Sequence, residues 1–224
     1  MSTTSAAGRR GLFITLEGPD GSGKTTQTRL LTERLRQEGH QVVESVEPGG
    51  TPIGQQIRRI LLDPANQELC PTAELLLMFA ARAQNVDQLI QPALAEGKIV
   101  VSDRFTDSSV AYQGAGRGLG YDTVMKVDRI ACRGLVPDLT LCIDIDTETG
   151  LARAHSRNRV EVAKRESRLD EQAIEFHRKA RAAYHELAQR EPQRFRLIDG
   201  NGRPDEIAAK VWDVVAAFLA SRAS

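Results

Sequence analysis

A run of small and polar residues near the N-terminus has the residue types and the spacing of a phosphate-binding loop. The run is Gly18, Pro19, Asp20, Gly21, Ser22, Gly23, Lys24, Thr25 and Thr26. Its order matches the pattern G-x-x-x-x-G-K-[ST], whose glycines let consecutive backbone N–H groups point inward at a phosphate. Lys24 is then placed to meet the β- and γ-phosphates of a nucleotide, and Thr25 is placed to hold magnesium. We therefore expect this run to bind ATP with Mg²⁺, although the loop alone leaves another nucleotide open.

A second pair of charged residues follows another predicted strand. Asp103 and Arg104 come just after the apolar run Ile99–Val101. In an open α/β sheet, residues at the carboxyl ends of the strands lie at the edge where ligands bind. Asp103 would hold magnesium, directly or through water, and Arg104 would offer a planar fork to a second phosphate group, which a simple ATPase does not need. On local sequence alone, a surface ion pair between the two remains the alternative.

These side chains need a sheet that brings its strand ends together. Strands are predicted at Leu12–Glu17, Gln41–Val46, Ile99–Val101, Leu139–Ile143 and Phe195–Ile198, and helices at about 25–38, 52–62, 72–96, after Asp170 through Leu187, and 205–219. Strands that alternate with helices pair in parallel through right-handed crossovers. The expected fold class is therefore α/β: a three-layer P-loop NTPase fold with a five-stranded parallel sheet flanked by helices.

Proline positions mark the ends and bends of two predicted helices. Thr51 stands as N-cap of the helix that begins with Pro52, a position where proline is favourable because its missing N–H has no helical partner. Pro92 lies inside the long predicted helix and is expected to break or kink it.

The amino-acid composition limits the kinds of partner that the protein is expected to bind. Lys and Arg number 30 and Asp and Glu number 30, so no overall field attracts nucleic acid or anionic lipid, and neither is expected as a partner. The 224 residues suit one domain, and residues 1–11 lack the apolar run of a signal peptide and are expected to form a flexible tail. No stretch is apolar enough to span a membrane, and the three cysteines show no metal-binding pattern, which indicates a cytoplasmic protein.

The segment from about 151 to 168 is rich in arginine and poor in large apolar side chains. Its arginines are Arg153, Arg157, Arg159, Arg165 and Arg168. We expect an exposed lid that closes over ATP, excludes water and brings guanidinium groups to the transferring phosphoryl group. A solvated helix face without a catalytic role would have the same composition, so the assignment of each arginine stays open.

Four motifs can be compared with known families by their order and spacing. They are Gly18–Thr26, Glu47-Pro48-Gly49-Gly50-Thr51, Phe79-Ala80-Ala81-Arg82 and the run from Asp103 to Gly114. Together they resemble bacterial thymidylate kinase (dTMP kinase), a P-loop nucleoside monophosphate kinase, and the resemblance runs from about Phe13 to the C-terminus. It implies transfer of the γ-phosphate of ATP to dTMP, giving dTDP and ADP for dTTP biosynthesis, with Mg²⁺ as cofactor and a homodimeric assembly.

The resemblance also implies a set of acceptor-binding residues. The implied dTMP-binding residues are Asp20, Glu47, Pro48, Phe79, Arg82, Arg104, Ser108, Ser109, Tyr112 and Gln113. Arg104 would hold the dTMP phosphate, Arg82 would lie near the pyrimidine edge, and Phe79 would stack on the thymine ring. Plain core packing is the alternative for Phe79, since it shares an apolar helix face with Leu75 and Met78.

The sugar and the base have further implied contacts. By the resemblance, Asp20 receives the deoxyribose 3′-hydroxyl, and Ser109 hydrogen-bonds the base at a position where relatives usually have Thr or Asn. Tyr112 and Gln113 would shape the sugar pocket, and Tyr112 would crowd a ribose 2′-hydroxyl. For Asp20, a solvated loop position is the alternative.

The implied catalytic groups are cationic. They are Lys24, Arg104, Arg153 and Arg157, with Thr25 and Asp103 as the metal-binding residues. Gly21, which follows the acid of the phosphate-binding loop, resembles the class whose catalytic arginine comes from the lid. The acceptor phosphate has a second pKa of about 6, so no general base is required, and the four histidines are expected to be structural.

Other functions remain as alternatives. A kinase for another pyrimidine nucleoside monophosphate, dUMP or UMP, is the nearest, because Ser109 is shorter than the usual residue. A P-loop binding module without turnover is an alternative of a different class. The sequence does not favour a switch GTPase, since it contains no N-K-x-D tetrapeptide. Nor does it favour a dinucleotide-binding dehydrogenase, because Gly114-Ala115-Gly116 does not follow a predicted strand as a dinucleotide-binding loop must.

Overall fold

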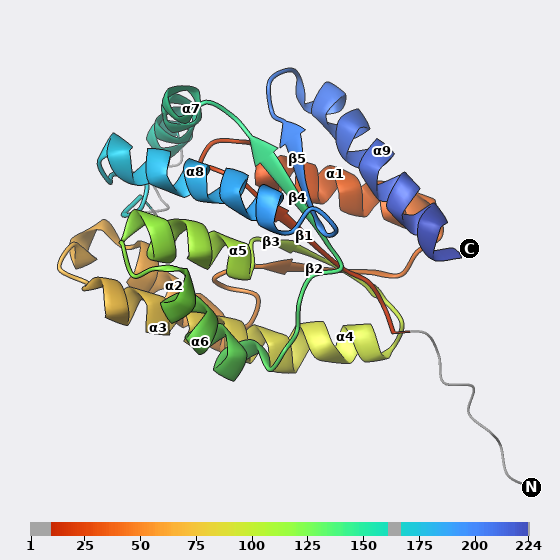
Figure 1. Cartoon of the computed structure of the whole chain (residues 1–224), viewed down its shortest axis with the longest axis horizontal. Coiled ribbons are helices and arrows are strands. Elements are labelled where there is room, and N and C mark those ends of the chain that lie inside the picture. The colour runs from red at the N-terminus through yellow and green to blue at the C-terminus, as the bar shows by residue number, and fades with distance from the viewer. Residues whose placement is uncertain (1–9, 161–166, 224) are drawn as a thin grey trace, which may run out of the picture.

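The computed structural model describes residues 10–160 and 167–223. Most of the expected tail at residues 1–11, and residues 161–166 of the expected lid, including Arg165, lie outside this part of the chain. The described elements surround one central sheet, with the C-terminal helix along its upper right in the view of Figure 1. No described helix has a stretch long and apolar enough to cross a membrane.

The sheet has five parallel strands in the order β2-β3-β1-β4-β5. The strands are β1 (Phe13–Glu17), β2 (Val42–Val46), β3 (Ile99–Asp103), β4 (Leu139–Asp144) and β5 (Phe195–Asp199). Every strand predicted from the sequence is present, and the predicted fold class is confirmed. The register pairs Leu16 with Asp103 and Val46 with Asp103, so the carboxyl ends of the three strands β1, β2 and β3 lie at the same edge.

Helices cover both faces of the sheet (Figure 1). The longer helices are α1 (Lys24–Gln37), α2 (Pro52–Leu62), α3 (Pro71–Asn85), α6 (Tyr121–Cys132), α7 (Thr147–Val160), α8 (Ile174–Arg190) and α9 (Pro204–Ala223). The shorter ones are η1 (Pro64–Asn66), η2 (Val86–Ile90), α4 (Gln91–Ala95), α5 (Thr106–Ser109) and η3 (Val110–Gly116). Side chains of α1 and α9 pack on one face, whereas those of α3, η2, α4, η3, α6 and α8 pack on the other.

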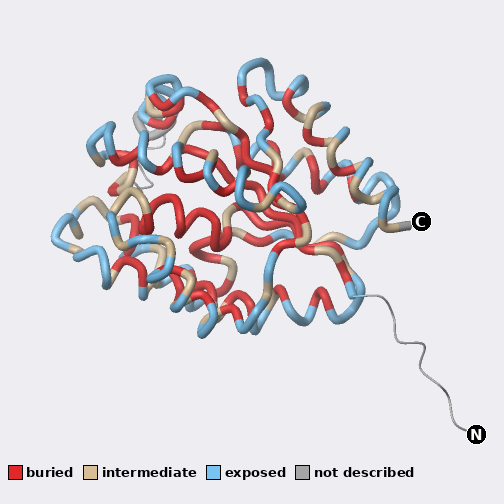
Figure 2. Tube along the Cα trace, in the orientation of Figure 1, coloured by how far each residue is buried: buried red, intermediate tan, exposed pale blue. Residues whose placement is uncertain are grey.

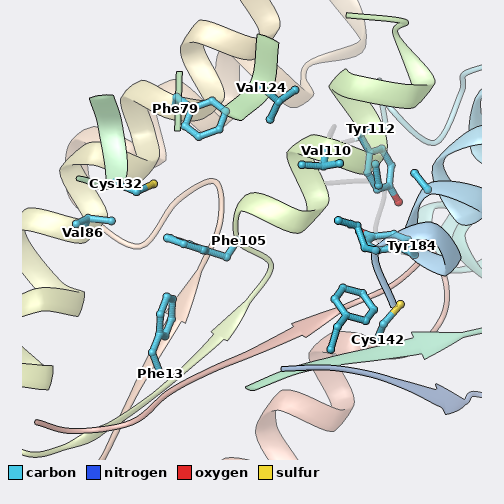
Figure 3. Packing of buried hydrophobic residues seen from close by; sticks show 14 of the residues in the cluster. Phe13, Phe79, Val86, Phe105, Val110, Tyr112, Val124, Cys132, Cys142 and Tyr184 are labelled. Atoms are coloured by element: carbon cyan, nitrogen blue, oxygen red, sulfur yellow. The ribbon is translucent and has the colours of Figure 1, made fainter. Parts of the chain in front are cut away.

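The core follows from the alternation of side chains along the strands. Phe13 belongs to the cluster on one face and Ile14 to the cluster on the other, and Val100 and Val101 divide in the same way. Successive side chains of a strand point to opposite faces, and a parallel sheet covered on both sides needs apolar residues at both. The central strands β1, β3 and β4 are accordingly buried, as Figure 2 shows along the centre of the molecule, whereas the edge strands β2 and β5 are partly exposed. Figure 3 shows Phe13 beneath Phe105, with ring centroids 4.9 Å apart in an edge-on arrangement.

The long helix predicted at 72–96 is present but is not regular. α3 continues through the π-helical turn η2 into α4, and η2 lies immediately before Gln91 and Pro92. Proline lacks an N–H and its ring collides with the carbonyl one turn earlier, so the wider π-helical turn accommodates Pro92 without ending the helix. The predicted N-cap of α2 is also confirmed, because Thr51 Oγ1 accepts a hydrogen bond from the Gly54 N–H at 3.0 Å.

The helical region between β3 and β4 was not predicted. α5 leads into the seven-residue π-helix η3, which crosses the glycine-rich stretch Gly114–Gly116, and α6 follows. Glycine is a poor helix former, so this stretch gives no helical signal in the sequence. In the structure, a Cβ atom at Gly116 would lie 2.6 Å from the ring of Phe176 on α8, so the glycine allows the close approach of these two helices.

Candidate active site

A cleft of about 510 Å³ opens at the carboxyl edge of the sheet. Its lining includes Asp20, Gly21, Gly23, Lys24, Thr25 and Thr26 from the phosphate-binding loop and the start of α1. It also includes Glu47, Pro48, Arg82, Asp103, Arg104, Ser108, Ser109, Tyr112 and Gln113. Every residue predicted for the acceptor nucleotide except Phe79 therefore lies on the same cleft as the phosphate-binding loop.

The loop has the backbone conformation that phosphate binding requires. Gly18, Gly21 and Gly23 all have positive φ, which glycine adopts without steric cost, and α1 begins at Lys24 directly after them. The Lys24 ammonium donates to the Pro19 carbonyl at 2.7 Å. Burial, together with repulsion from Arg104, lowers the pKa of Lys24 to about 8. The loop thus presents a helix N-terminus and a nearby ammonium group to one position.

The two predicted metal-binding residues meet directly. Thr25 Oγ1 donates a hydrogen bond to Asp103 Oδ2 at 2.6 Å, although the residues come from α1 and from the end of β3. A hydroxyl and a carboxylate are the oxygen ligands that magnesium takes in proteins, usually together with waters and phosphates. The pair therefore fits a magnesium ion bound mainly through a nucleotide.

Arg104 is held from several sides in a conformation that is uncommon for a residue with a side chain. Its φ is 73°. Its guanidinium donates to Asp20 Oδ1 at 2.6 Å and to Ser108 Oγ at 2.9 Å. The Tyr112 hydroxyl donates to the other oxygen of Asp20 at 2.8 Å. Burial opposes ionisation of Asp20, but the charges of Arg104 and Lys24 outweigh it and lower the pKa of the carboxyl group.

Arg82 forms a second buried cationic group in the cleft, and its side chain is 3% exposed. Its Nε donates to Glu47 at 2.5 Å, and its terminal nitrogens donate to Ser109 Oγ and the Phe105 carbonyl, each at 3.0 Å. The guanidinium lies 4.5 Å from the centroid of the Phe79 ring. Phe79 is 2% exposed and belongs to the core cluster. The predicted stacking of Phe79 on thymine stays a prediction, because the ring does not line the cleft.

Gln113 is fixed by a buried carboxylate outside the cleft. Its amide donates to Glu74 at 2.9 Å, and Glu74 also accepts from Arg117 and, at 2.6 Å, from Arg168. Arg168 is 1% exposed and donates in addition to the Leu61 carbonyl. The expectation of an exposed lid through residue 168 is wrong for Arg168, since a guanidinium with buried partners of this kind is part of the framework.

The remaining lid residues are described only in part. α7 continues the chain to Val160, so the first part of the expected lid is helical. Arg153 is exposed on this helix, and the side chains of Arg157 and Arg159 lie outside the described part of the structure. A Cβ atom at Gly21 would lie 1.9 Å from the Gly150 carbonyl oxygen, so the start of α7 packs directly on the phosphate-binding loop. The lid and its catalytic arginines stay predictions.

Several residues of the site were missed from the sequence. The cleft is also lined by Val46, Arg58, Leu62, Met78, Leu169 and Asp170. Arg58 donates to the Pro48 carbonyl at 2.8 Å, and its position two turns into the helix after the Glu-Pro-Gly-Gly-Thr motif could have indicated it. His177, which was expected to be structural, is 3% exposed, and its Nδ1 lies 3.7 Å from Asp20 Oδ2. Burial lowers the pKa of His177, which favours its neutral form.

Three comparisons with known proteins agree. The Thymidylate kinase family model matches residues 16–211. A thymidylate kinase of Pelobacter propionicus is 50% identical over 212 residues, which cover 95% of each chain. One of Syntrophotalea carbinolica is 48% identical over 200 residues, covering 89% of this chain and 93% of its own. The crystal structure of thymidylate kinase from Ehrlichia chaffeensis matches with a TM-score of 0.74 at 31% identity, covering 92% of this chain and 99% of that one.

Proposed function

Because the chain belongs to the thymidylate kinase family, we propose that its cleft holds ATP and dTMP together and transfers the γ-phosphoryl group to dTMP, yielding dTDP and ADP. One observation carries the proposal: a phosphate-binding loop and a second cationic pocket share a single cleft. Lys24 belongs to the first, and Arg104 and Arg82 belong to the second. Two phosphate groups that repel each other need cations on both sides to come into reacting distance.

The reaction needs positioning more than proton transfer. An oxygen of the dTMP phosphate forms a bond to the γ-phosphorus while the bond from that phosphorus to the bridging oxygen of ADP breaks. The acceptor phosphate is largely dianionic at neutral pH, so no residue has to remove a proton from it. Lys24 would stabilise the charge on the β- and γ-phosphates, and Arg104 would hold the attacking phosphate.

Thr25 and Asp103 would hold magnesium. Their oxygens are 2.6 Å apart next to the phosphate-binding loop, which supports a shared role. Magnesium held there would supply positive charge that offsets the charge of the β- and γ-phosphates. The residues Gly18 to Thr26 would supply the N–H groups that orient these phosphates.

The acceptor pocket would recognise dTMP through contacts with its base and its sugar. Arg82, placed by Glu47 and Ser109, would face the edge of the pyrimidine. Tyr112 and Asp20, bonded to each other at 2.8 Å, would face the sugar, with Asp20 receiving the 3′-hydroxyl. Gln113, Pro48 and Ser108 would complete the walls. Phe79, whose ring packs against the Arg82 guanidinium, would stack on the thymine ring.

Arg153 and Arg157 would act from the lid. The contact between Gly21 and Gly150 supports this, since Arg153 follows Gly150 by one turn of α7 and is exposed. A guanidinium brought in by closure would stabilise charge on the transferring group while water is excluded.

We further propose a cytoplasmic homodimer with no nucleic-acid or membrane partner. Large apolar side chains remain exposed on two helices that pack together, Leu76 on α3 at 53% and Ile130 on α6 at 80%, which supports a self-association surface. The equal numbers of basic and acidic residues, 30 each, support the absence of a polyanionic partner.

A panel of acceptors tests the function. ADP production would be coupled to a spectroscopic readout, with ATP, Mg²⁺ and either dTMP, dUMP, UMP or no acceptor. We expect dTMP to give the highest kcat/KM, and the reaction without acceptor to be negligible. A clear preference for UMP would favour the other pyrimidine kinase, and the absence of ADP production with every monophosphate would favour a binding module without turnover.

A further inference from the structure

Glu17, the last residue of β1, is a buried carboxylate that no step of the proposed reaction uses. It is 0% exposed and precedes the first glycine of the phosphate-binding loop. Three groups from distant parts of the chain donate to it. The Phe105 N–H donates to Oε1 at 2.7 Å, and the hydroxyls of Ser108 and Tyr184 donate to Oε2 at 2.5 Å and 3.1 Å. A buried carboxylate that accepts several hydrogen bonds restrains the positions of its donors.

Two of these donors lead to the guanidinium of Arg104. Ser108 Oγ accepts from Arg104 Nη1 at 2.9 Å while it donates to Glu17. Tyr184 Oη lies 3.0 Å from Ser108 Oγ and 3.5 Å from Arg104 Nη1. Since Glu17 accepts from both hydroxyls, their oxygen lone pairs remain free to face Arg104. Glu17 thus orients the acceptors of the arginine without touching it.

The third donor holds the backbone at Arg104. The left-handed conformation of this residue is unfavourable for an L-amino acid, so it has to be held by its surroundings. The Arg104 N–H donates to the Leu16 carbonyl at 3.0 Å, and the Arg104 carbonyl accepts from Ser102 Oγ at 2.8 Å. Glu17 binds the next N–H in the chain, that of Phe105. The turn at Arg104 is therefore fixed on both sides, and Glu17 supplies the fixation on the C-terminal side.

We propose that Glu17 is a positioning residue that holds Arg104, through the Phe105 N–H and the Ser108 and Tyr184 hydroxyls, in the orientation that receives the acceptor phosphate. The inference rests on the proposed function of the cleft, in which Arg104 binds dTMP. It assigns to Glu17 no contact with either nucleotide. Its removal should weaken the use of dTMP while ATP binding stays intact.

The ionised form of Glu17 is the one that accepts all three hydrogen bonds. Burial, reinforced by the charge of Asp107, raises the pKa of Glu17 to about 7, whereas Arg104 opposes the rise. The ionisable groups that face it are Arg104, Asp107, Tyr184, Cys142 and Lys24. A drop in pH through 7 would protonate part of the Glu17 population and remove one acceptor position from this network.

Steady-state kinetics of Glu17→Gln test the proposal. We expect kcat/KM for dTMP to fall about tenfold or more, the effect of losing one charged hydrogen bond, with KM for ATP within about twofold of wild type. Asp107→Asn is the matched control, because Asp107 is also a buried carboxylate, 3% exposed, but pairs with Arg194 and makes no hydrogen bond to Arg104 or its acceptors. The control should lose stability without a selective loss for dTMP.

A pH profile separates positioning from a general loss of stability. In wild type, kcat/KM for dTMP should decline below about pH 7, and Glu17→Gln should lack this part of the decline. If Glu17→Gln does not fold, Tyr184→Phe removes one donor to Glu17 and keeps the ring in the core, and it should lower kcat/KM for dTMP selectively. If the wild-type protein phosphorylates dTMP and these variants keep the wild-type kcat/KM for dTMP, the proposal is overturned. Failure of wild type to phosphorylate dTMP would instead overturn the function of the cleft.

Discussion

The ammonium group of Lys24 is buried beside another cation, and this combination determines how the protein should respond to pH. Burial and the charge of Arg104 lower its pKa to about 8 from the ordinary value of 10.5. The free protein therefore loses the Lys24 proton as the pH rises through 8, whereas bound phosphates would keep it protonated.

We predict that kcat/KM for ATP is level up to about pH 8 and then falls about tenfold per pH unit, while kcat at saturating ATP changes little. Initial rates at saturating dTMP, measured between pH 6.5 and 9.5, check this. Tyr112→Phe should show the same decline, because its hydroxyl bonds to Asp20 and not to Lys24. A level profile up to about pH 9.5 would contradict the role of Lys24 as a phosphate-binding cation with a lowered pKa.

The sequence identified the residues of the cleft whose role depends on neighbours close in the chain. The glycines and Lys24 form one continuous loop, so their spacing alone predicts their function. Glu17 and Arg168 were not identified, because their partners are far away: Glu17 binds the N–H of Phe105, 88 residues later, and Arg168 binds Glu74, 94 residues earlier. Arg168 was instead grouped with the lid arginines by local composition, which carries no information on its burial.

At the scale of elements, the strands and the helices α1, α2, α3, α8 and α9 were predicted because each has its own periodicity. The π-helical turns η2 and η3 were not, since they depend on Pro92 in one case and on the approach of α8 in the other. The same limit applies to the contact between the phosphate-binding loop and α7. The sequence contains Gly21 and Gly150, but only the fold shows that their backbones touch.

That contact leads to a prediction for Gly21→Ala. At Gly21, φ is 71° and a Cβ atom would meet the Gly150 carbonyl oxygen at 1.9 Å. We expect the variant to lose about 3 kcal/mol or more of unfolding free energy, because both strain and a backbone collision arise. Chemical denaturation without nucleotide measures this loss.

Gly39→Ala is the control for strain alone. Its φ is 89°, and nothing lies within 4 Å of the added Cβ atom. It should cost only about 1 to 2 kcal/mol and leave dTMP kinase activity unchanged. Equal losses of unfolding free energy in the two variants would show that the contact between α7 and the phosphate-binding loop adds nothing to the destabilisation.

At the scale of the whole molecule, the alternation of strands and helices was sufficient to predict the parallel sheet and its covered faces, because parallel pairing requires crossovers. The strand order and the assembly of the chain could not be derived from the pattern of residues. The exposed Ile130 and Leu76 on adjacent helices offer a surface for pairing.

Sedimentation equilibrium should give about twice the chain mass of 24.6 kDa. We predict that Ile130→Glu shifts the protein toward monomer, since it places a charge within an apolar contact. Leu197→Glu, on β5 and 40% exposed, is the comparison and should leave the mass unchanged. A wild-type mass equal to that of one chain would refute the homodimer.

Transfer of label from γ-³²P-ATP tests most directly whether the two phosphate sites act together. With Mg²⁺ and dTMP, the label should appear in dTDP, and little should be released as inorganic phosphate. Arg104→Met should reduce this transfer by about a hundredfold or more while ATP binding persists, because the loop around Lys24 remains. Label released only as inorganic phosphate, or at a rate that does not depend on dTMP, would contradict the account.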